Sequence, residues 1–183
     1  MPSSQRLVRL FVALHPPEDV ARRLLDAAAK VVDPLHRFSA IEQVHLTLLF
    51  IGDRPGRELR DVAESTERAA AGVRAFELTA QELLTLPEKP EPRLLAATTN
   101  LPSPLIELHR RLVLRLAKPA QRRDSSEILP HLTLCRFDQQ ISVAPIHSPL
   151  SGPTFPVHRI SLIKSVLLRG GALHETVATV ELG

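Results

Sequence analysis

The tetrapeptide His-Leu-Thr-Leu occurs twice in this chain of 183 residues, at positions 45–48 and 131–134. Successive side chains of a β-strand point to opposite faces, so each copy would present an imidazole and a hydroxyl on one face and two leucines on the other. Strand packing requires neither the histidine nor the threonine, because apolar residues satisfy it. The repeat therefore indicates that these histidines and threonines have a chemical role.

Two imidazoles that face each other suit acid–base catalysis on a phosphodiester. Because the pKa of histidine is ordinarily near ~6.5, one ring can accept a proton while the other donates one. In-line displacement at phosphorus needs both at once, from opposite sides. The hydroxyls of Thr47 and Thr133 would donate hydrogen bonds to the non-bridging oxygens. Such a reaction requires no metal and no cofactor.

Other kinds of site fit the sequence less well. Neither motif has a carboxylate or a third histidine at metal-ligand spacing. The chain has no Gly-x-Ser-x-Gly motif, and Cys135 is typical of a small apolar strand residue. His15 ends the first expected strand within possible reach of the cleft, but no role is assigned to it. The remaining histidines show no pattern and are expected at the surface or in hydrogen bonds: His36, His109, His147, His158 and His174.

The two motifs lie in similar series of expected elements. Apolar periodicity predicts a strand over 9–14, a helix over 16–33 and a strand over 44–52, then a strand over 93–99, a helix over 103–118 and a strand over 130–137. The first helix would bury Val20, Leu24, Ala27 or Ala28, and Val31. The second would have Ser103 as its N-cap and would bury Leu105, Leu108, Leu112 and Leu116.

Further elements follow each motif. The pattern predicts a helix over 57–73, a strand opening the 75–86 segment, late strands over 155–168 and 175–182, and a loop over 148–156. We expect an α+β fold of two pseudo-symmetric lobes, each an antiparallel β-sheet with helices packed outside, and an active-site cleft between the lobes. The Pro-rich tract 86–93 would divide a single domain, 1–183, into lobes of roughly 1–86 and 93–183, whose strands could intertwine.

Composition limits the class of protein. The chain is 44% hydrophobic and 23% charged, with a net charge of +3 that is compatible with a polyanionic partner. No run approaches the roughly 18 apolar residues of a membrane span, and the N-terminal stretch lacks the pattern of a signal peptide. We expect a cytoplasmic monomer that does not bind membranes. A single cysteine excludes an internal disulfide.

Four stretches resemble a known family: "RLFVAL" followed by "PP", "VHLTLLFIGD", "PHLTLCRF" and "SLIKSVLLRGGALHETVATVEL". Paired H-x-T-x motifs in two repeated lobes resemble the two-histidine phosphoesterase superfamily, and the whole chain resembles its RNA 2′,3′-cyclic phosphodiesterase (2′-5′ RNA ligase) branch. There are two departures. Only Phe38 supplies an aromatic side chain before the first motif, and the closing S-x-L-x-x-x-G-x-x-Y pattern lacks its tyrosine.

The resemblance implies specific roles. His45 would be the proton donor and His131 the proton acceptor, which the identical motifs alone do not distinguish. The reaction would hydrolyse RNA 2′,3′-cyclic phosphate ends, such as those of tRNA fragments, to 2′-phosphates, with 2′-5′ ligation as its reverse. Arg136 and Phe11 would contact the substrate. Strict alternation places Arg136 on the face opposite His131 unless a bulge intervenes, and a core position suits Phe11 equally.

Two other functions are also compatible with these residues. Within the superfamily, the substrate would instead be a small cyclic nucleotide or ADP-ribose cyclic phosphate. Outside enzymes, the chain would be a non-catalytic RNA- or nucleotide-binding module. Arg122 and Arg123, just before the second motif, are further candidates for phosphate contacts, although exposed solvated charges explain them as well.

Overall fold

A computed structural model describes residues 6–87, 91–119, 128–138, 140–168 and 171–183. Its strands are β1 (Leu7–Leu14), β2 (Arg37–Phe38), β3 (Leu46–Pro55), β4 (Phe76–Leu86), β5 (Leu94–Thr99), β6 (His131–Arg136), β7 (His147–Pro149), β8 (Thr154–Val157), β9 (Arg159–Leu168) and β10 (Gly171–Glu181). Its helices are α1 (Glu18–Ala28), α2 (Leu59–Ala70) and α3 (Ser103–Leu116), with short 3₁₀ turns η2 (Ile41–Gln43) and η3 (Gly56–Glu58). The expected α+β class is confirmed.

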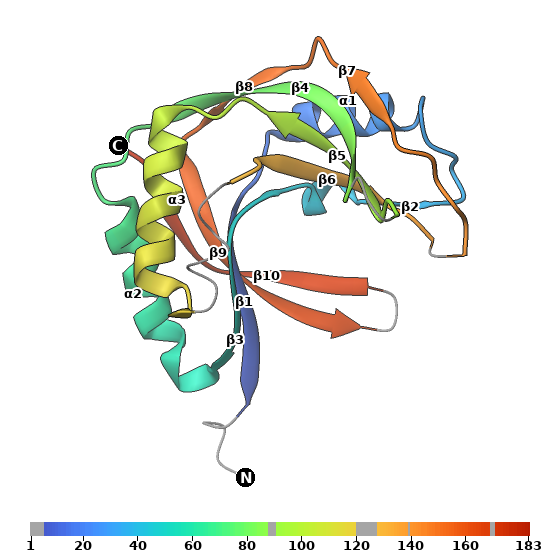
Figure 1. The fold of residues 1–183 in the computed structure, drawn as a ribbon. Coiled ribbons are helices and arrows are strands. Elements are labelled where there is room, and N and C mark those ends of the chain that lie inside the picture. The colour runs from blue at the N-terminus through green and yellow to red at the C-terminus, as the bar shows by residue number, and fades with distance from the viewer. Residues whose placement is uncertain (1–5, 88–90, 120–127, 139, 169–170) are drawn as a thin grey trace.

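The strands pair in antiparallel fashion along one path, β10-β9-β1-β3-β6-β5-β4-β7, with β2 beside β6 and β8 beside β4. Figure 1 shows a strongly bent sheet, with β4, β5 and β6 in one part and β1, β9 and β10 in another. The strands of the two motifs, β3 and β6, are neighbours in the middle and meet at Leu46 and Leu132. The fold therefore brings together two segments that are distant in sequence.

The order of the strands does not follow the two halves of the sequence. β4, from the first half, pairs with β5, β7 and β8 from the second. Conversely, β9 lies against β1, and β10 lies against β9. Strands are thus exchanged between the halves, so that the C-terminal hairpin β9–β10 stands beside the first motif instead of the second.

The three helices pack on the sheet through apolar stripes. The buried side of α1 includes Val20, Ala21, Leu24 and Ala28, and that of α3 includes Leu105, Leu108, Leu112 and Leu116, as the periodicity predicts. α2 and α3 contact each other and run side by side along one flank of the sheet (Figure 1). One large apolar core joins these helices to the leucines of both motifs.

The helix boundaries differ from the expected ones. α1 ends at Ala28, so Val31 lies outside the helical stripe and is 38% exposed, while the next residue, Val32, is buried. In α3 the N-cap is Pro102 and makes no side-chain cap, so the predicted cap residue Ser103 is instead the first helical residue. A proline in the first helical turn costs no hydrogen bond, which explains why the helix tolerates Pro104 there.

Two strand predictions were incomplete. The 75–86 segment forms one continuous strand, β4, and the 148–156 loop contains the end of β7 and most of β8. In β8 the side chains of Phe155 and Val157 are buried while Pro156 is exposed. Proline has no N–H to donate, so it is tolerated in a strand at such an edge, and its presence there misled the loop prediction.

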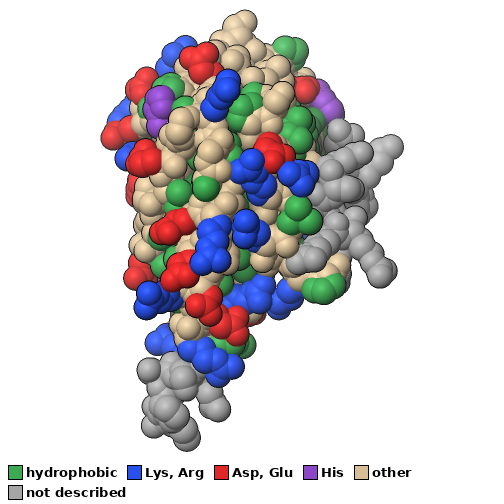
Figure 2. All heavy atoms as spheres, turned by 90° about the vertical axis from the view of Figure 1, so that its left-hand side faces the viewer, with side chains coloured by type: hydrophobic (Ala, Val, Ile, Leu, Met, Phe, Trp, Pro, Cys, Tyr) green, Lys and Arg blue, Asp and Glu red, His purple; other side chains and the backbone are tan. Residues whose placement is uncertain are grey.

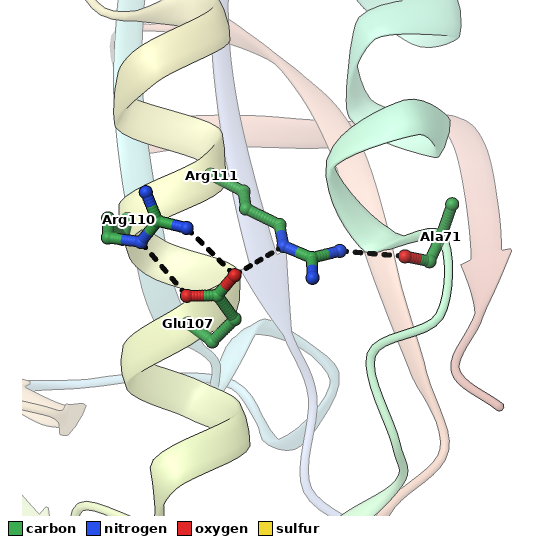
Figure 3. Close-up of polar contacts among 4 residues, drawn as sticks. All are labelled: Ala71, Glu107, Arg110 and Arg111. Atoms are coloured by element: carbon green, nitrogen blue, oxygen red, sulfur yellow. Dashed lines mark hydrogen bonds and ion pairs between the residues drawn. The ribbon is translucent and has the colours of Figure 1, made fainter.

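The outer surface of α2 and α3 carries charges of both signs in close alternation (Figure 2). Figure 3 shows Glu107 of α3 accepting hydrogen bonds from Arg110 and Arg111 at 2.7–2.9 Å, and these bonds lower the pKa of Glu107 to about 2. Arg111 also donates to the carbonyl oxygen of Ala71 at 2.7 Å, at the C-terminal end of α2. Acidic and basic side chains on this surface neutralise one another, and the contact of Arg111 with Ala71 joins the two helices. Among the described residues, no helix is long and apolar enough to cross a bilayer.

Candidate active site

Both motif histidines are held by the same backbone contact. His45 immediately precedes β3, and its Nδ1 lies 2.7 Å from the carbonyl oxygen of Gln43. His131 opens β6, and its Nδ1 lies 2.9 Å from the carbonyl oxygen of Leu129. A carbonyl only accepts hydrogen bonds, so Nδ1 carries the proton in both rings. Nε2 is thereby left free to accept a proton from a substrate or to donate one to it.

A register shift at the last residue of each motif changes which face the later side chains occupy. In the pairing of β3 with β1 Leu48 is the extra residue, and in the pairing of β6 with β5 Leu134 is the extra residue. Such bulges redirect the next side chains by one position. Phe50 therefore shares a face with Thr47, and Arg136 shares a face with Thr133. The bulge that Arg136 needs to reach the cleft is present.

The carbonyl groups at both bulges are hydrogen-bonded from neighbouring segments. Nδ1 of His109, on α3, donates to the carbonyl oxygen of Leu48 at 2.8 Å. The backbone N–H of Ser39 donates to the carbonyl oxygen of Leu134 at 2.8 Å, and the Ser39 hydroxyl donates to that of Thr133 at 3.1 Å. These contacts stabilise the bulged geometry on both strands.

Both His/Thr pairs line one pocket of about 730 Å³. Its other polar lining residues among those described are Arg9, Arg37, Ser39, Gln43, His109, Arg136, Ser165 and His174, and Phe38 also lines it. Three arginines and four histidines thus face the pocket, and no described lining residue is a carboxylate. The charge of such a pocket suits an anionic ligand. The candidates Arg122 and Arg123 lie outside the described residues.

His45 lies among other rings at one side of the pocket. Ring centroids are 5.2 Å apart for His45 and Phe11, 5.2 Å for His45 and His174, and 5.8 Å for His45 and His15. Two of these imidazoles, His45 and His174, contact Phe11, which forms a small apolar cluster with Ala13 and Ile163, separate from the main core. The side-chain amide of Gln43 donates to the carbonyl oxygen of Ala172 at 3.2 Å, which ties the segment before His45 to β10.

This environment disfavours the charged form of His45. Burial lowers its pKa to about 4; the hydrogen bond to Gln43 opposes the shift, while His174, His15 and Arg136 add to it. Burial and the charge of Arg136 also lower the pKa of His174, whose Nδ1 is buried without a hydrogen-bond partner among the described residues. In the free protein at neutral pH, His45 is therefore uncharged.

Phe11 lines the pocket but is only 2% exposed, so it offers almost no surface to a ligand. Phe50, which the sequence did not single out, stacks on it with a centroid distance of 5.8 Å and an interplanar angle of 9°. Phe50 is 51% exposed. The open aromatic surface of the pocket therefore belongs to Phe50, while Phe11, which was expected to contact the substrate, lines the pocket with little exposed surface.

The single cysteine is not placed to act as a nucleophile. Cys135 is fully buried, as expected for an apolar strand residue, and burial raises the pKa of its thiol to about 11. Within the described part of the chain, no group of three or more His, Cys, Asp or Glu side chains is arranged to hold a metal ion.

A family model for the 2′-5′ RNA ligase superfamily matches residues 11–167. The chain belongs to this superfamily. A superfamily relative from Thermus thermophilus, RNA 2′,3′-cyclic phosphodiesterase, is 29% identical in an alignment that covers 96% of this chain and 90% of that protein. The resemblance inferred from the motifs is thus confirmed.

Solved structures show the same superfamily fold. TT0787 of Thermus thermophilus superposes with a TM-score of 0.79 and 26% identity, covering 95% of this chain and 97% of that one. E. coli LigT in complex with NADP⁺ superposes with a TM-score of 0.77 and 24% identity, covering 97% and 99%. LigT has also been crystallised with ATP and with 3′-AMP.

Several residues that line the pocket of this superfamily member were not identified from the sequence, among them His174, Phe50, Arg9 and Arg37. His174 was expected at the surface or in a hydrogen bond, yet it lines the pocket beside His45. It stands where the closing pattern counted from Ser165 would have its tyrosine, which was the available signal. Phe50 follows Thr47 by the same three positions that separate Arg136 from Thr133. Arg9 and Arg37 gave no signal, because their placement depends on strand pairing.

Proposed function

We propose that this protein hydrolyses RNA ends carrying a 2′,3′-cyclic phosphate to 2′-phosphomonoesters by paired histidine acid–base catalysis. The observation that carries this proposal is the pocket in which two His/Thr pairs meet three arginines and no described carboxylate. Cationic and hydroxyl groups suit a phosphodiester. Divalent metals prefer carboxylate oxygens. The reaction is therefore proposed to be independent of metal ions.

In the proposed reaction, Nε2 of His131 accepts a proton from a water molecule whose oxygen forms a bond to phosphorus. The bond from phosphorus to O3′ breaks, and Nε2 of His45 donates its proton to that oxygen. The products are a free 3′-hydroxyl and a 2′-phosphate. Both Nδ1 atoms are engaged with backbone carbonyls, which supports the use of both Nε2 atoms.

The transition state carries extra negative charge on the non-bridging oxygens. Thr47 and Thr133 each lie one strand repeat after their histidine and would donate hydrogen bonds to these oxygens. Arg136 would supply a fixed positive charge, and the bulge at Leu134 supports this role because it turns Arg136 to the same face. No step needs a covalent intermediate on the protein.

The donor role of His45 requires substrate binding to change its proton affinity. With a pKa of about 4 in the free protein, His45 is protonated in roughly one molecule in a thousand at pH 7. A phosphodiester anion beside the ring favours the imidazolium and raises this pKa. We infer that His45 takes up its proton together with the substrate, so the acid is formed only where it is needed.

The arrangement of strands supports two pseudo-symmetric lobes that meet at β3 and β6. On one side β1 pairs with β3, and on the other β5 pairs with β6. A helix precedes each motif strand, α1 in the first case and α3 in the second. We propose that each lobe contributes one His/Thr pair to a cleft between them.

The same site would catalyse the reverse chemistry. In that reaction a 5′-hydroxyl takes the place of water, attacks the cyclic phosphate and yields a 2′-5′ linkage. The exposed ring of Phe50 is proposed to stack on the terminal base, because an aromatic ring can stack on any of the four bases. Phe11 would act indirectly by supporting Phe50 and His45.

A second candidate substrate is a small cyclic nucleotide or ADP-ribose cyclic phosphate. A pocket of about 730 Å³ is within the usual range for small ligands. LigT of E. coli, which shares the fold, has been crystallised with NADP⁺ and with 3′-AMP. The RNA proposal and this one share the reaction at phosphorus and differ in what lies beyond the terminal nucleotide.

The test is incubation with an oligoribonucleotide ending in a 2′,3′-cyclic phosphate, with EDTA present, followed by ³¹P NMR of the product. We expect complete conversion to the 2′-phosphate and a higher kcat/KM than for ADP-ribose 1″,2″-cyclic phosphate. The opposite preference would favour the small substrate. Binding of both without turnover would identify a non-catalytic binding module, and activity restored only by added Mg²⁺ or Zn²⁺ would contradict the metal-free mechanism.

A further inference from the structure

The sheet face that carries the site continues past His45 toward the other end of β1. Along β1, Phe11 and Ala13 face the apolar cluster, and His15 follows just beyond the strand. On β9 the residues directly opposite Phe11 and Ala13 are Ile163 and Ser161. Directly paired residues share a face of the sheet. Ser161 therefore lies on the same face as the active site.

The hairpin partner β10 contributes two hydroxyls to this face. Thr176 lies opposite Ile163, and Thr179 lies opposite Ser161, because the register shifts at Val177. Without that extra residue, two threonines three positions apart would point to opposite faces. The bulge thus gathers the hydroxyls of Ser161, Thr176 and Thr179 on one side.

These hydroxyls line a second pocket, of about 710 Å³. Its other polar lining residues among those described are His15, His158, Arg159 and Glu181. The ring of His15, at the boundary of this pocket, has its centroid 5.8 Å from that of His45. A nucleic-acid strand advances ~3.4 Å per nucleotide in a regular helix, so this pocket begins within one or two nucleotides of the reacting phosphate.

The charges of the second pocket favour a phosphate over a neutral group. Arg159 forms no ion pair with any residue in the described part of the chain, and it is close enough to His15 to contribute to lowering its pKa. The single carboxylate, Glu181, lies opposite Arg159 on β10. An unpaired guanidinium with three nearby hydroxyls provides the donors that a phosphodiester needs.

We propose that this second pocket, lined by Arg159, Ser161, Thr176 and Thr179, binds the internucleotide phosphodiester on the 5′ side of the reacting nucleotide. The inference rests on the proposed function, in which His45 faces the 3′-oxygen of that nucleotide, so the ribose and the strand leading to it lie on the His45 side. The pocket makes an oligonucleotide a better substrate than a mononucleotide.

The test compares two trinucleotides that end in a 2′,3′-cyclic phosphate. One has a natural phosphodiester at the linkage before the terminal nucleotide, and the other has an uncharged methylphosphonate there. For the wild-type protein we expect kcat/KM to be about tenfold higher with the phosphodiester, the usual size of a charged hydrogen bond. Arg159→Ala should remove most of this ratio, and Glu181→Gln should increase it, because one repulsive charge is lost.

Arg60→Ala is the matched control, because Arg60 is 88% exposed on α2 and lines neither pocket, so this substitution removes the same charge elsewhere. It should leave the ratio unchanged. Equal rates with both trinucleotides in the wild-type protein would overturn the proposal. So would a loss in Arg159→Ala that is the same for both trinucleotides, since Arg159 would then act on the histidines and not on the strand.

A binding measurement separates this inference from the proposed reaction. The corresponding trinucleotide 2′-phosphates, with either linkage, are titrated against the wild-type protein and Arg159→Ala by calorimetry. Tighter binding of the phosphodiester that depends on Arg159 supports the pocket even if no cyclic phosphate is hydrolysed. Equal affinity for both linkages overturns it even if hydrolysis is fast.

Discussion

The two motifs have the same four residues and the same local backbone but different surroundings. Each histidine donates from Nδ1 to the carbonyl two residues earlier, and each strand bulges at the fourth residue of its motif. His45, however, lies beside Phe11, His174 and His15, and burial lowers its pKa to about 4. The backbone determines which ring nitrogen is left free to meet a ligand, and the neighbouring side chains determine the proton affinity of the ring.

The difference extends to the residue three positions after each threonine. On β3 this residue is Phe50, and on β6 it is Arg136, each turned toward the pocket by the bulge before it. An aromatic ring offers a surface for a base, whereas a guanidinium offers charge for a phosphate. The same bulge therefore presents two unlike side chains to the pocket, and variants at matched positions of the two motifs can show how far the two halves differ.

The largest effect is expected when either imidazole is removed. His45→Ala and His131→Ala should each lower kcat by about 10²–10⁴-fold, because each removes one proton-transfer group. The measurement is hydrolysis of the oligonucleotide cyclic phosphate, with thermal unfolding to check the fold. His147→Ala is the control, since His147 contacts Glu82 outside the pocket. A variant at either motif with nearly wild-type rates would refute the paired mechanism.

The threonines should matter less. Thr47→Val and Thr133→Val are expected to lower kcat by roughly one to three orders of magnitude through lost hydrogen bonds to the phosphate oxygens. Thr47→Ser and Thr133→Ser keep the hydroxyl and should retain most of the rate. If the valine variants lost stability but not activity, the threonines would have a structural role only.

The pH dependence should reveal the uptake of a proton by His45. A donor must be protonated, so the rate falls as pH rises through its pKa. That pKa is about 4 in the free protein and is raised by the bound anion. The alkaline fall of kcat/KM, which reports the free protein, should therefore lie at lower pH than that of kcat. Coinciding falls in the two profiles would show that binding does not change the donor.

The smallest effect is expected at the neighbour of His45. His174→Gln removes a positive charge that lowers the pKa of His45, so this pKa should rise. Of the two motif histidines, His174 makes a ring contact with His45. The titration of the His45 ring can be followed by NMR. An unchanged or lower pKa of His45 in His174→Gln would contradict the effect assigned to His174.

The sequence predicted the parts of the structure that local patterns control. The alternation in each motif correctly placed Leu46 and Leu132 in the core, and periodicity predicted the buried stripe of α3. Helix ends were missed. The strand expected over 155–168 is divided into β8 and β9, and Pro156 suggested a loop where pairing with β4 makes β8 a strand of its own. Local propensity is overridden by tertiary pairing in such cases.

The pocket was predictable only in part. Both histidines and both threonines followed from the repeat, and Arg136 followed with the condition of a bulge. His174 could not be placed, because it reaches His45 through the pairing of β9 with β1 and of β10 with β9. The low pKa of His45 could not be predicted from the sequence either. It depends on burial among side chains that other strands supply, such as Phe11 of β1 and His174 of β10, which no single motif encodes.

The most direct test of the central claim replaces the leaving atom. In a 2′,3′-cyclic phosphate whose 3′-oxygen is replaced by sulfur, the leaving thiolate needs no proton, because a thiol has a pKa of only ~8.5. We predict that the defect of His45→Ala largely disappears with this substrate, whereas that of His131→Ala persists. The reverse pattern would exchange the two roles. Equal, undiminished defects in both variants would contradict acid catalysis by His45.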